Sequence, residues 1–322
     1  MRKSAKTQET RGNIARVQSY HQGGSWIDEE AYTFAGFESN KCFTSDRFIP
    51  LTAEHKRADG KPFKGIGIEV ENVCESITDN TVLANVWKHI IMREFPDDLW
   101  KMQSDSSLEG ESSVECITQI MTKEFIRNQY PAFKKMFDSY FPAFGITAAD
   151  DSCGMHVNIS NAWFGGTDAI VEESVRKLLY FINHHFDFCC DLFKRGRGNT
   201  YYCSRMTAYT RKESAQGADL HNFVSSHGVC LNLGHFDAGR VEIRLVGGQS
   251  KFAAFRNTME TVFFLIPALK SLSWAQLDDL GRVFQGCNQY VLSRLMDCTR
   301  AGSLTAEDYN RIQATVKREE YI

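Results

Sequence analysis

Hydrophobic and polar residues alternate with period two in several short segments of the chain. In "GIGIEVE" (65–71), three aliphatic residues point to one side of an extended strand, while two glycines and two glutamates point to the other. The segments "SSVECIT" (112–118) and "CGMHVNIS" (153–160) alternate in the same way. Each segment is therefore predicted to be a β-strand with one buried face.

Apolar residues spaced three to four positions apart predict the helices. This spacing predicts a helix over 79–94 and helical structure over 122–141 that is interrupted by Pro131. It also predicts one long amphipathic helix over 168–193 and a helical C-terminal stretch from residue 250 onward. The chain therefore mixes strands and helices along most of its length.

A hairpin is predicted near the C-terminal end of the strand region. It consists of "HGVCLNLGHF" (227–236), the turn "DAG" and "RVEIRLVGG" (240–248). Because a hairpin pairs its strands antiparallel, the predicted fold class is α+β. Residues 1–62 are predicted to form a partly mobile N-terminal extension, and residues 63–322 a single domain that includes the C-terminal helices.

Composition and charge narrow the classes of protein that need be considered. An apolar fraction of 43% with 12% aromatic residues excludes a mainly disordered chain. A net charge of −3 gives no global field that would recruit nucleic acid. The ten cysteines form no C-x-x-C pair, the N-terminus has no apolar signal core, and no apolar run could span a bilayer. A cytoplasmic protein with reduced thiols and no membrane or nucleic-acid partner is expected.

The polar faces of the predicted strands carry an uncommon set of side chains. This set comprises Glu69 and Glu71, then Glu115, then His156 and Asn158, then Asn232, and finally Arg240, Glu242 and Arg244. Any single strand can be explained as the wet face of an antiparallel sheet. Taken together, the scarcity of lysine and the glycines beside the acids favour a ligand that approaches the backbone closely.

Four glutamates on one concave face repel each other unless cations lie among them. Hard divalent cations, bound by carboxylates and by the phosphates of a substrate, would supply that positive charge. The sequence has no phosphate-binding P-loop, no complete dinucleotide fingerprint, no H-E-x-x-H helix and no G-x-S-x-G elbow. His184 and His185 lie on the predicted long helix, where a surface or core-edge role is favoured over metal binding.

Four motifs carry a resemblance to a known family. "GIGIEVE", "DSSLEGESSVECIT", "CGMHVNIS" and "RVEIRLVGG", in this order, resemble the amidoligase family of carboxylate–amine ligases, which is related to glutamate–cysteine ligases and glutamine synthetase. The resemblance covers residues 63–250. The second motif departs from the family pattern, because the family reads closer to D-G-S-L where this chain has Asp105 followed by two serines and Leu108.

The resemblance implies a fold and a reaction. The implied fold is a curved antiparallel sheet backed by helices, a half-barrel like the catalytic fold of glutamine synthetase. The implied activity is that of an ATP-dependent carbon–nitrogen ligase that uses Mg²⁺ or Mn²⁺. Such an enzyme transfers the γ-phosphoryl group of ATP to a carboxylate substrate, and an amine acceptor then displaces phosphate to form an amide. The two substrates could be small molecules, peptides or protein side chains.

The resemblance and the strand pattern together assign roles to individual residues. The metal ligands are expected to be Glu69, Glu71, Glu115, His156 and Glu242. The catalytic residues are expected to be Arg244, which would stabilise the transferring phosphoryl group, together with His156 and Arg205. The nucleotide is expected to contact Asn158, Asn232 and the basic residues of the loop "KRGRGNTYYCSR", namely Lys194, Arg195, Arg197 and Arg205.

Several of these assignments leave an alternative open. For any one of the four basic loop residues, a solvated surface position explains the sequence equally well. Asp105 could orient the amine or a metal-bound water, or could cap a turn. Two other functions also fit the residues: a metal-dependent hydrolase that uses the same acids and His156, and a catalytically silent nucleotide-binding scaffold.

Overall fold

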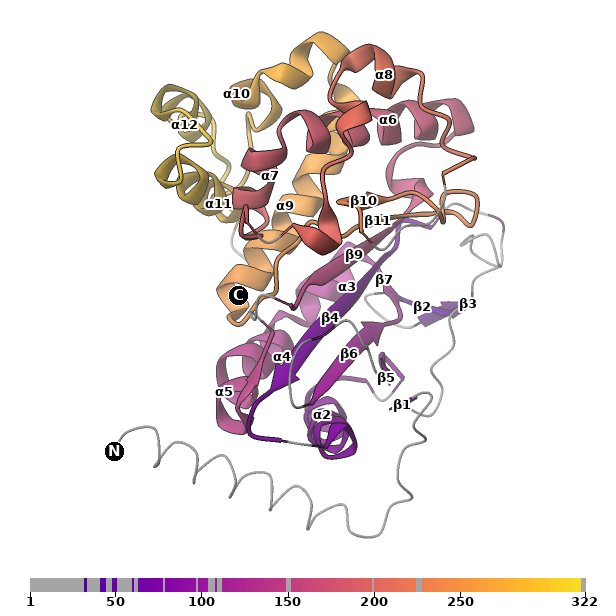
Figure 1. Ribbon diagram of the computed structural model, residues 1–322, viewed down its shortest axis with the longest axis vertical. Helices are drawn as coiled ribbons and strands as arrows, with labels where there is room; N and C mark the ends of the chain where they lie inside the picture. Colours follow the sequence, from indigo (N-terminus) through magenta and orange to yellow (C-terminus); the bar gives the residue numbers. More distant parts are fainter. Residues whose placement is uncertain are drawn as a thin grey trace. The chain divides into compact units, whose positions relative to one another are not determined.

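The structure of the chain is a computed structural model (Figure 1). It describes residues 32–33, 41–44, 48–50, 60, 63–77, 79–96, 98–103, 108, 112–148, 152–198, 200–223 and 228–319. Most of the predicted N-terminal extension lies outside the described residues, and so does Asp105.

The chain divides into two compact units. The first comprises Met1–Phe48, Gly67–Met155 and Gly248–Ala254, and the second comprises Ile49–Ile66, His156–Gly247 and Phe255–Ile322. The boundaries between the units therefore fall inside strands β3 (Phe48–Pro50), β4 (Ile66–Cys74) and β9 (Met155–Ser160) and inside helix α9 (Phe252–Ser271).

The first unit contains a mixed sheet and a group of helices. Its remaining strands are β1 (Tyr32–Thr33), β2 (Lys41–Phe43), β5 (Trp100–Gln103), β6 (Ser113–Thr118), β7 (Ile120–Met121) and β8 (Ile146–Thr147). Its helices are α2 (Asn80–Glu94), α3 (Lys123–Asn128), α4 (Tyr130–Lys135), the π-helical turn η1 (Met136–Tyr140) and α5 (Phe141–Phe144). The strands lie in the order β1, β5, β6, β4, β7, β2 (Figure 1). β8 also pairs with β4. β2 and β7 pair parallel, whereas β6 pairs antiparallel with both β4 and β5.

Helix α2 shows how the sequence builds the core of the first unit. It begins after Asp79, whose side chain accepts a hydrogen bond of 2.7 Å from the amide of Thr81 and so caps the helix. Its apolar stripe is buried and packs against β6. The indole of Trp87 donates to Oδ1 of Asn72 at 2.7 Å, and Asn72 donates to the carbonyl of Val114 at 2.7 Å. These bonds satisfy a buried amide that would otherwise destabilise the core.

The second unit contains a smaller sheet and most of the helices. Its strands are β9 with β10 (Leu231–Asn232) and β11 (Arg240–Ile243). Its helices are α6 (Asp168–His184), α7 (Phe186–Leu192), α8 (Lys212–Gln216), α9, α10 (Leu280–Val283), α11 (Gln289–Arg300) and α12 (Ala306–Gln313). Four short 3₁₀ turns complete it: η2 (Asn161–Trp163), η3 (Tyr201–Cys203), η4 (Thr207–Tyr209) and η5 (Trp274–Asp278). Helix α6 packs against α8, and α11 packs against α7 and α12 (Figure 1).

The sheet of the second unit is antiparallel, with β11 between β10 and β9. Glu242 lies opposite Asn232 on one side and Asn158 on the other, and Arg240 lies opposite Ser160. Opposite residues point to the same face, so these polar side chains share one face of the sheet. The turn between β10 and β11 spans residues 234–239 and is wider than the predicted "DAG"; Gly239 closes it with a φ of +87°, which favours glycine.

The prediction of a single helix over 168–193 is wrong at one position. The chain leaves the α-helix at His185, whose φ and ψ are −98° and 38°, and α7 starts at Phe186. The ring of His185 hydrogen-bonds through Nε2 to the carbonyl of Leu277 at 3.0 Å, which holds the residue at the break. A contact with a residue so distant in sequence cannot be seen in local periodicity.

The prediction of a fold that mixes strands and helices, with a curved sheet backed by helices, is confirmed. So are the strands predicted over 65–71, 112–118 and 153–160 and the helix predicted over 79–94, apart from their end residues. The sheet is mixed and not antiparallel throughout, because β2 and β7 pair parallel. A fold like that of glutamine synthetase stays a prediction, and so does the division into an extension and one catalytic domain.

Candidate functional site

Glu242 is the centre of a buried polar network in the second unit. Asn232 donates from Nδ2 to Oε2 of Glu242 at 2.8 Å, and Arg244 donates from Nη1 to Oε1 at 2.7 Å. The strand register brings these groups together, because Asn232 is the direct partner of Glu242, and Arg244, the residue after β11, lies two residues beyond Glu242 on the same face. All three side chains are buried. A carboxylate in such surroundings is stable only with donors of this kind.

His156 also belongs to the network, and one donor of Arg244 has no partner in it. Nδ1 of His156 lies 3.4 Å from Nη1 of Arg244 and 3.5 Å from Oε1 of Glu242. Nε of Arg244 is buried and has no hydrogen-bond partner among the described residues. Buried N–H groups are almost always satisfied in folded proteins. An unused donor at this position is what is expected where an oxygen of a ligand completes the network.

Cys230 lies beside the network and does not contribute a nucleophile. Its carbonyl accepts a hydrogen bond of 3.0 Å from the amide of Arg244, and its Sγ lies 3.5 Å from Oδ1 of Asn183. Burial raises the pKa of the Cys230 thiol to about 12. The thiol is therefore protonated at neutral pH and unreactive. The chemistry of this face depends on its nitrogen and oxygen groups.

Two glutamates face each other in the first unit. Glu71 of β4 and Glu115 of β6 are direct cross-strand partners, and both are buried. Oε2 of Glu71 accepts a hydrogen bond from the amide of Gly154, and Oε2 of Glu115 accepts one of 2.6 Å from Nε2 of Gln103. Like charges directly opposite each other destabilise a strand pair. A divalent cation with a preference for oxygen ligands would relieve that repulsion.

The predicted metal ligands are divided between the two units. Glu69 lies two residues before Glu71 on the same face of β4, is half-buried and pairs across the sheet with Ile117. These glutamates and Glu115 belong to the first unit, whereas His156 and Glu242 belong to the second. Within the first unit the register brings Glu71 and Glu115 together, and within the second His156 and Glu242 are in contact.

Two residues of the basic loop form ion pairs on the surface of the second unit. Nζ of Lys194 lies 2.6 Å from Oδ2 of Asp297. The guanidinium of Arg197 holds Asp191 through two hydrogen bonds, one of them 3.1 Å from Nε to Oδ1. Ion pairs within the second unit thus account for the placement of both side chains, and contact with ATP stays a prediction for each.

The start of this loop is attached to the strand that carries Arg244. Nη2 of Arg195 donates to the carbonyl of Val246 at 2.9 Å. A Cβ atom at Gly247 would lie 2.2 Å from the carbonyl oxygen of Lys194, so only glycine allows this approach. Arg195 is buried and binds main chain, which gives it a structural role in this arrangement.

Arg205, predicted to be catalytic, lies at the C-terminal end of α6. Its Nε donates to the carbonyl of Asn183 at 2.7 Å, and its Nη2 lies 3.5 Å from the carbonyl of His184. Cations at this end of a helix satisfy free carbonyls and interact favourably with the helix dipole. Helix capping is the role that these contacts support.

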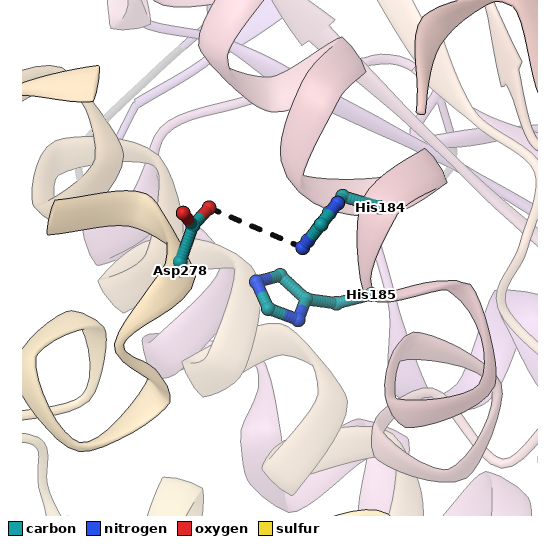
Figure 2. A group of neighbouring side chains, drawn as sticks. All are labelled: His184, His185 and Asp278. Atoms are coloured by element: carbon teal, nitrogen blue, oxygen red, sulfur yellow. Dashed lines mark ion pairs between the residues drawn. The ribbon is translucent and has the colours of Figure 1, made fainter. Parts of the chain in front are cut away.

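A second group of residues with metal-ligand chemistry consists of His184, His185 and Asp278 (Figure 2). Nε2 of His184 lies 4.0 Å from Oδ1 of Asp278. Nδ1 of His184 lies 3.0 Å from the carbonyl of Thr210, and Nε2 of His185 lies 3.0 Å from the carbonyl of Leu277. A carbonyl only accepts, so each of these two ring nitrogens carries the proton.

Both carboxylate oxygens of Asp278 already have donors from the protein. Tyr180 donates to Oδ1 at 2.6 Å, and the ammonium of Lys212 contacts Oδ2. Burial alone would raise the pKa of Asp278, but the hydrogen bonds from Lys212 and Tyr180 hold that pKa below its usual range. Burial and the bond to Asp278 raise the pKa of Tyr180, and burial lowers the pKa of His185. A metal here would compete with the Lys212 ammonium and with the His185 proton.

We call these five residues, Tyr180, His184, His185, Lys212 and Asp278, the Asp278 clasp. The clasp joins α6, α8 and η5 within the second unit. Its internal hydrogen bonds agree with the helix-surface role that the sequence predicts for the two histidines.

No protein-family model matches the sequence, and a search of curated proteins finds no match. The resemblance to amidoligases therefore stays a prediction. None of the described helices is long and apolar enough to cross a bilayer.

Two residues near the candidate groups were given no role by the sequence. Gln103 holds Glu115, and Arg240 contacts Asn158. The alternation of "WKMQ" in β5 could have pointed to Gln103, since it is polar at every second residue. Arg240 was visible on the polar face of its strand, but its partner depends on the register with β9.

Proposed function

We propose that this protein is a cytoplasmic, ATP- and Mg²⁺-dependent carboxylate–amine ligase that forms an amide through an acyl-phosphate intermediate. The observation that carries the proposal is the buried Glu242–Arg244 pair with its unused Nε donor. A planar guanidinium matches the oxygens of phosphoryl and carboxylate groups better than any other side chain. The resemblance of the four sequence motifs supplies the class of reaction.

The donor groups of the first unit fit a divalent cation. Glu71 and Glu115 offer carboxylate oxygens from directly opposite positions, the ligand type that Mg²⁺ and Mn²⁺ prefer. Glu69, also on β4, is proposed as a further ligand there, and His156 and Glu242, which are in contact in the second unit, keep the metal-ligand role that the sequence predicts. A bound cation would neutralise the charge of the ATP phosphates.

Arg244 is proposed to stabilise the transferring phosphoryl group. Phosphoryl transfer depends mainly on positioning and on electrostatic stabilisation. Glu242 already holds the guanidinium in place, so little reorganisation is needed when a ligand binds. Asn158, Asn232 and the basic residues of loop 194–205 are proposed to contact the nucleotide.

The proposal is tested by incubating the purified protein with MgATP, hydroxylamine and a small-metabolite extract. ADP, phosphate and hydroxamate are expected together. Arg244→Lys should lower their rate about 10²- to 10³-fold, because one stabilising donor array is lost. Glu71→Gln and Glu115→Gln should raise the Mg²⁺ concentration needed for half-maximal turnover about tenfold or more. Glu307→Gln, which removes an exposed charge from α12, is the matched control and should change neither quantity.

The alternative products distinguish the competing functions. AMP and pyrophosphate would show adenylation and contradict the acyl-phosphate route. Cleavage of amides or phosphoesters without nucleotide would favour a metal-dependent hydrolase. Nucleotide binding without turnover across a broad set of carboxylates would favour the silent scaffold.

A further inference from the structure

β11 begins with Arg240, on the face of the strand that holds Glu242 and that Arg244 continues directly after the strand. Residues 240, 242 and 244 point to the same side because side chains alternate along a strand. Arg240 lies opposite Ser160 of β9 and is half-buried. It is therefore next to the Glu242 network within the same unit.

The guanidinium of Arg240 is oriented but largely unused. Its Nη1 donates to Oδ1 of the buried Asn158 at 3.1 Å. Over the part of the chain that the structure describes, this is the one hydrogen bond of that guanidinium, and no carboxylate forms an ion pair with it. A guanidinium has five N–H donors, so most of them are available. Arg176, equally half-buried, forms an ion pair with Glu172 at 2.8 Å and a hydrogen bond to the carbonyl of Ala218 at 3.0 Å, whereas Arg240 has no carboxylate partner among the described residues.

Arg240 and Arg244, at the two ends of β11, contact the same cross-strand pair. Arg244 donates a hydrogen bond to Glu242, two residues before it, and Arg240 donates one to Asn158 of the neighbouring strand β9. Glu242 and Asn158 are direct partners, so their Cα atoms lie about 5 Å apart. The two guanidinium groups thus approach the cross-strand pair of Asn158 and Glu242 from opposite directions along the strand. Only one carboxylate, Glu242, is hydrogen-bonded to them in the described residues.

We propose that Arg240 binds an anionic oxygen group of the substrate, together with Arg244, at this cross-strand pair. The inference rests on the proposed function and adds to it a residue that selects an oxyanion. The shared chemistry is that of a carboxylate or phosphate oxygen, which accepts paired hydrogen bonds from a planar guanidinium. The oxyanion comes either from the phosphates of ATP or from the carboxylate substrate.

Steady-state kinetics on variants of the full chain distinguish these two sources. Arg240→Gln should raise the KM for ATP or the KM for the carboxylate about 10- to 100-fold, with less than a tenfold change in kcat. The substrate whose KM changes is the one that Arg240 binds. Arg240→Lys keeps the charge but loses the planar fork, so it should restore only part of the affinity. Arg300→Gln removes an exposed arginine of α11 and should leave both constants unchanged.

A second variant guards against a folding artefact. Asn158→Asp keeps the size of the side chain and gives Arg240 a carboxylate partner. It should weaken anion binding as Arg240→Gln does. Far-UV circular dichroism and the melting temperature of each variant establish that the fold is retained.

Direct binding separates a failure of this inference from a failure of the proposed function. Calorimetric titration with inorganic tripolyphosphate and with succinate requires no turnover. A loss of affinity of about tenfold or more in Arg240→Gln is expected for one of the two anions. If the wild-type protein binds one of these anions, Arg240→Gln loses that affinity, and the wild type turns over no ATP with a broad set of carboxylates, the anion site is upheld and the ligase is contradicted. Full ligase activity with unchanged KM values and anion affinities in Arg240→Gln would overturn the inference and leave the ligase standing.

Discussion

The Glu242 network and the Asp278 clasp contain the same kinds of residue and differ in what they leave unused. Each combines a histidine, a carboxylate and a cation within the second unit. In the clasp the hydrogen bonds of Asp278 and of the protonated ring nitrogens are made inside the protein. In the network, Nε of Arg244 has no partner among the described residues although it is buried. Residue types alone therefore do not identify a site, and the unused donor of Arg244 is an additional observation that favours the network over the clasp.

Exposure adds a second difference. The Glu242 side chain is 6% exposed, whereas that of Asp278 is 46% exposed. Water screens the clasp, so its ion pair contributes little to stability. The network has no such screening, and the loss of one partner leaves an uncompensated buried charge. Mutations in the two regions should therefore have very different effects.

The largest effect is expected for Glu242→Ala. The variant leaves the Arg244 guanidinium buried without its carboxylate, which should lower the free energy of unfolding by about 3–5 kcal/mol. The urea midpoint, followed by circular dichroism, measures this change. Asp278→Ala is the matched comparison and should cost less than about 1 kcal/mol.

A double variant sharpens this first prediction. Glu242→Leu combined with Arg244→Met removes both charges and should recover most of the lost stability, because an apolar pair needs no compensation. Equal urea midpoints for Glu242→Ala and Asp278→Ala would contradict the contrast between the two regions.

A smaller effect on the stability of the clasp is expected from pH. The pKa of Asp278 is lowered in the folded state, so its stabilisation is present above the unfolded pKa of about 3.9 and is lost as pH falls through the folded pKa. The pKa of Tyr180 is raised, so its stabilisation is present below about pH 10 and is lost as pH rises through the folded pKa. The clasp should therefore weaken at both extremes.

Trp274 offers a local probe for this titration. Its ring lies 6.0 Å from that of Tyr180, in the turn that ends at Asp278. Its fluorescence is obtained by subtracting the signal of Trp274→Phe from that of the wild type. Asp278→Asn should remove the acid transition, and Tyr180→Phe should remove the alkaline one. An acid transition that persists in Asp278→Asn would assign it to another carboxylate.

The smallest effect is expected for Lys212→Met. The ammonium forms an ion pair with the exposed Asp278, so its loss should cost about 0–1 kcal/mol and less at high salt. The difference in melting temperature between the variant and the wild type should shrink as NaCl rises from 0.05 M to 1 M, values at which screening lengths differ by several-fold. A constant difference would show that packing of the Lys212 stem, and not its charge, supports the clasp.

Local patterns explain which elements were predicted well. The strand of Glu69 and Glu71 and the strand of His156 and Asn158 follow from alternation, because side chains of a strand point to opposite faces in turn. Helix α2 follows from its apolar spacing, and the structure shows that Asp79 caps it. The break at His185 was missed, because it depends on a hydrogen bond to Leu277, far along the chain.

The basic loop shows the limit of reasoning from residue types. Arg195 and Arg205 are of a residue type that often binds phosphate. In the structure, however, Arg195 donates a hydrogen bond to the carbonyl of Val246, and Arg205 donates to a carbonyl at the end of α6. Nothing in "KRGRGNTYYCSR" distinguishes these two uses of a guanidinium, since both involve oxygen acceptors. The acceptor is supplied by a segment remote in sequence.

The sequence by itself determined which residues share a face of each strand, because the period of a strand is a local property of the backbone. It thereby placed Glu69 with Glu71, and Arg240 with Glu242 and Arg244. Only the tertiary structure decided which of these residues meet across strands and which donors remain unused. Register and side-chain partners are set by long-range pairing and packing, so Glu71 opposite Glu115 and Glu242 opposite Asn158 could not be derived from any segment alone.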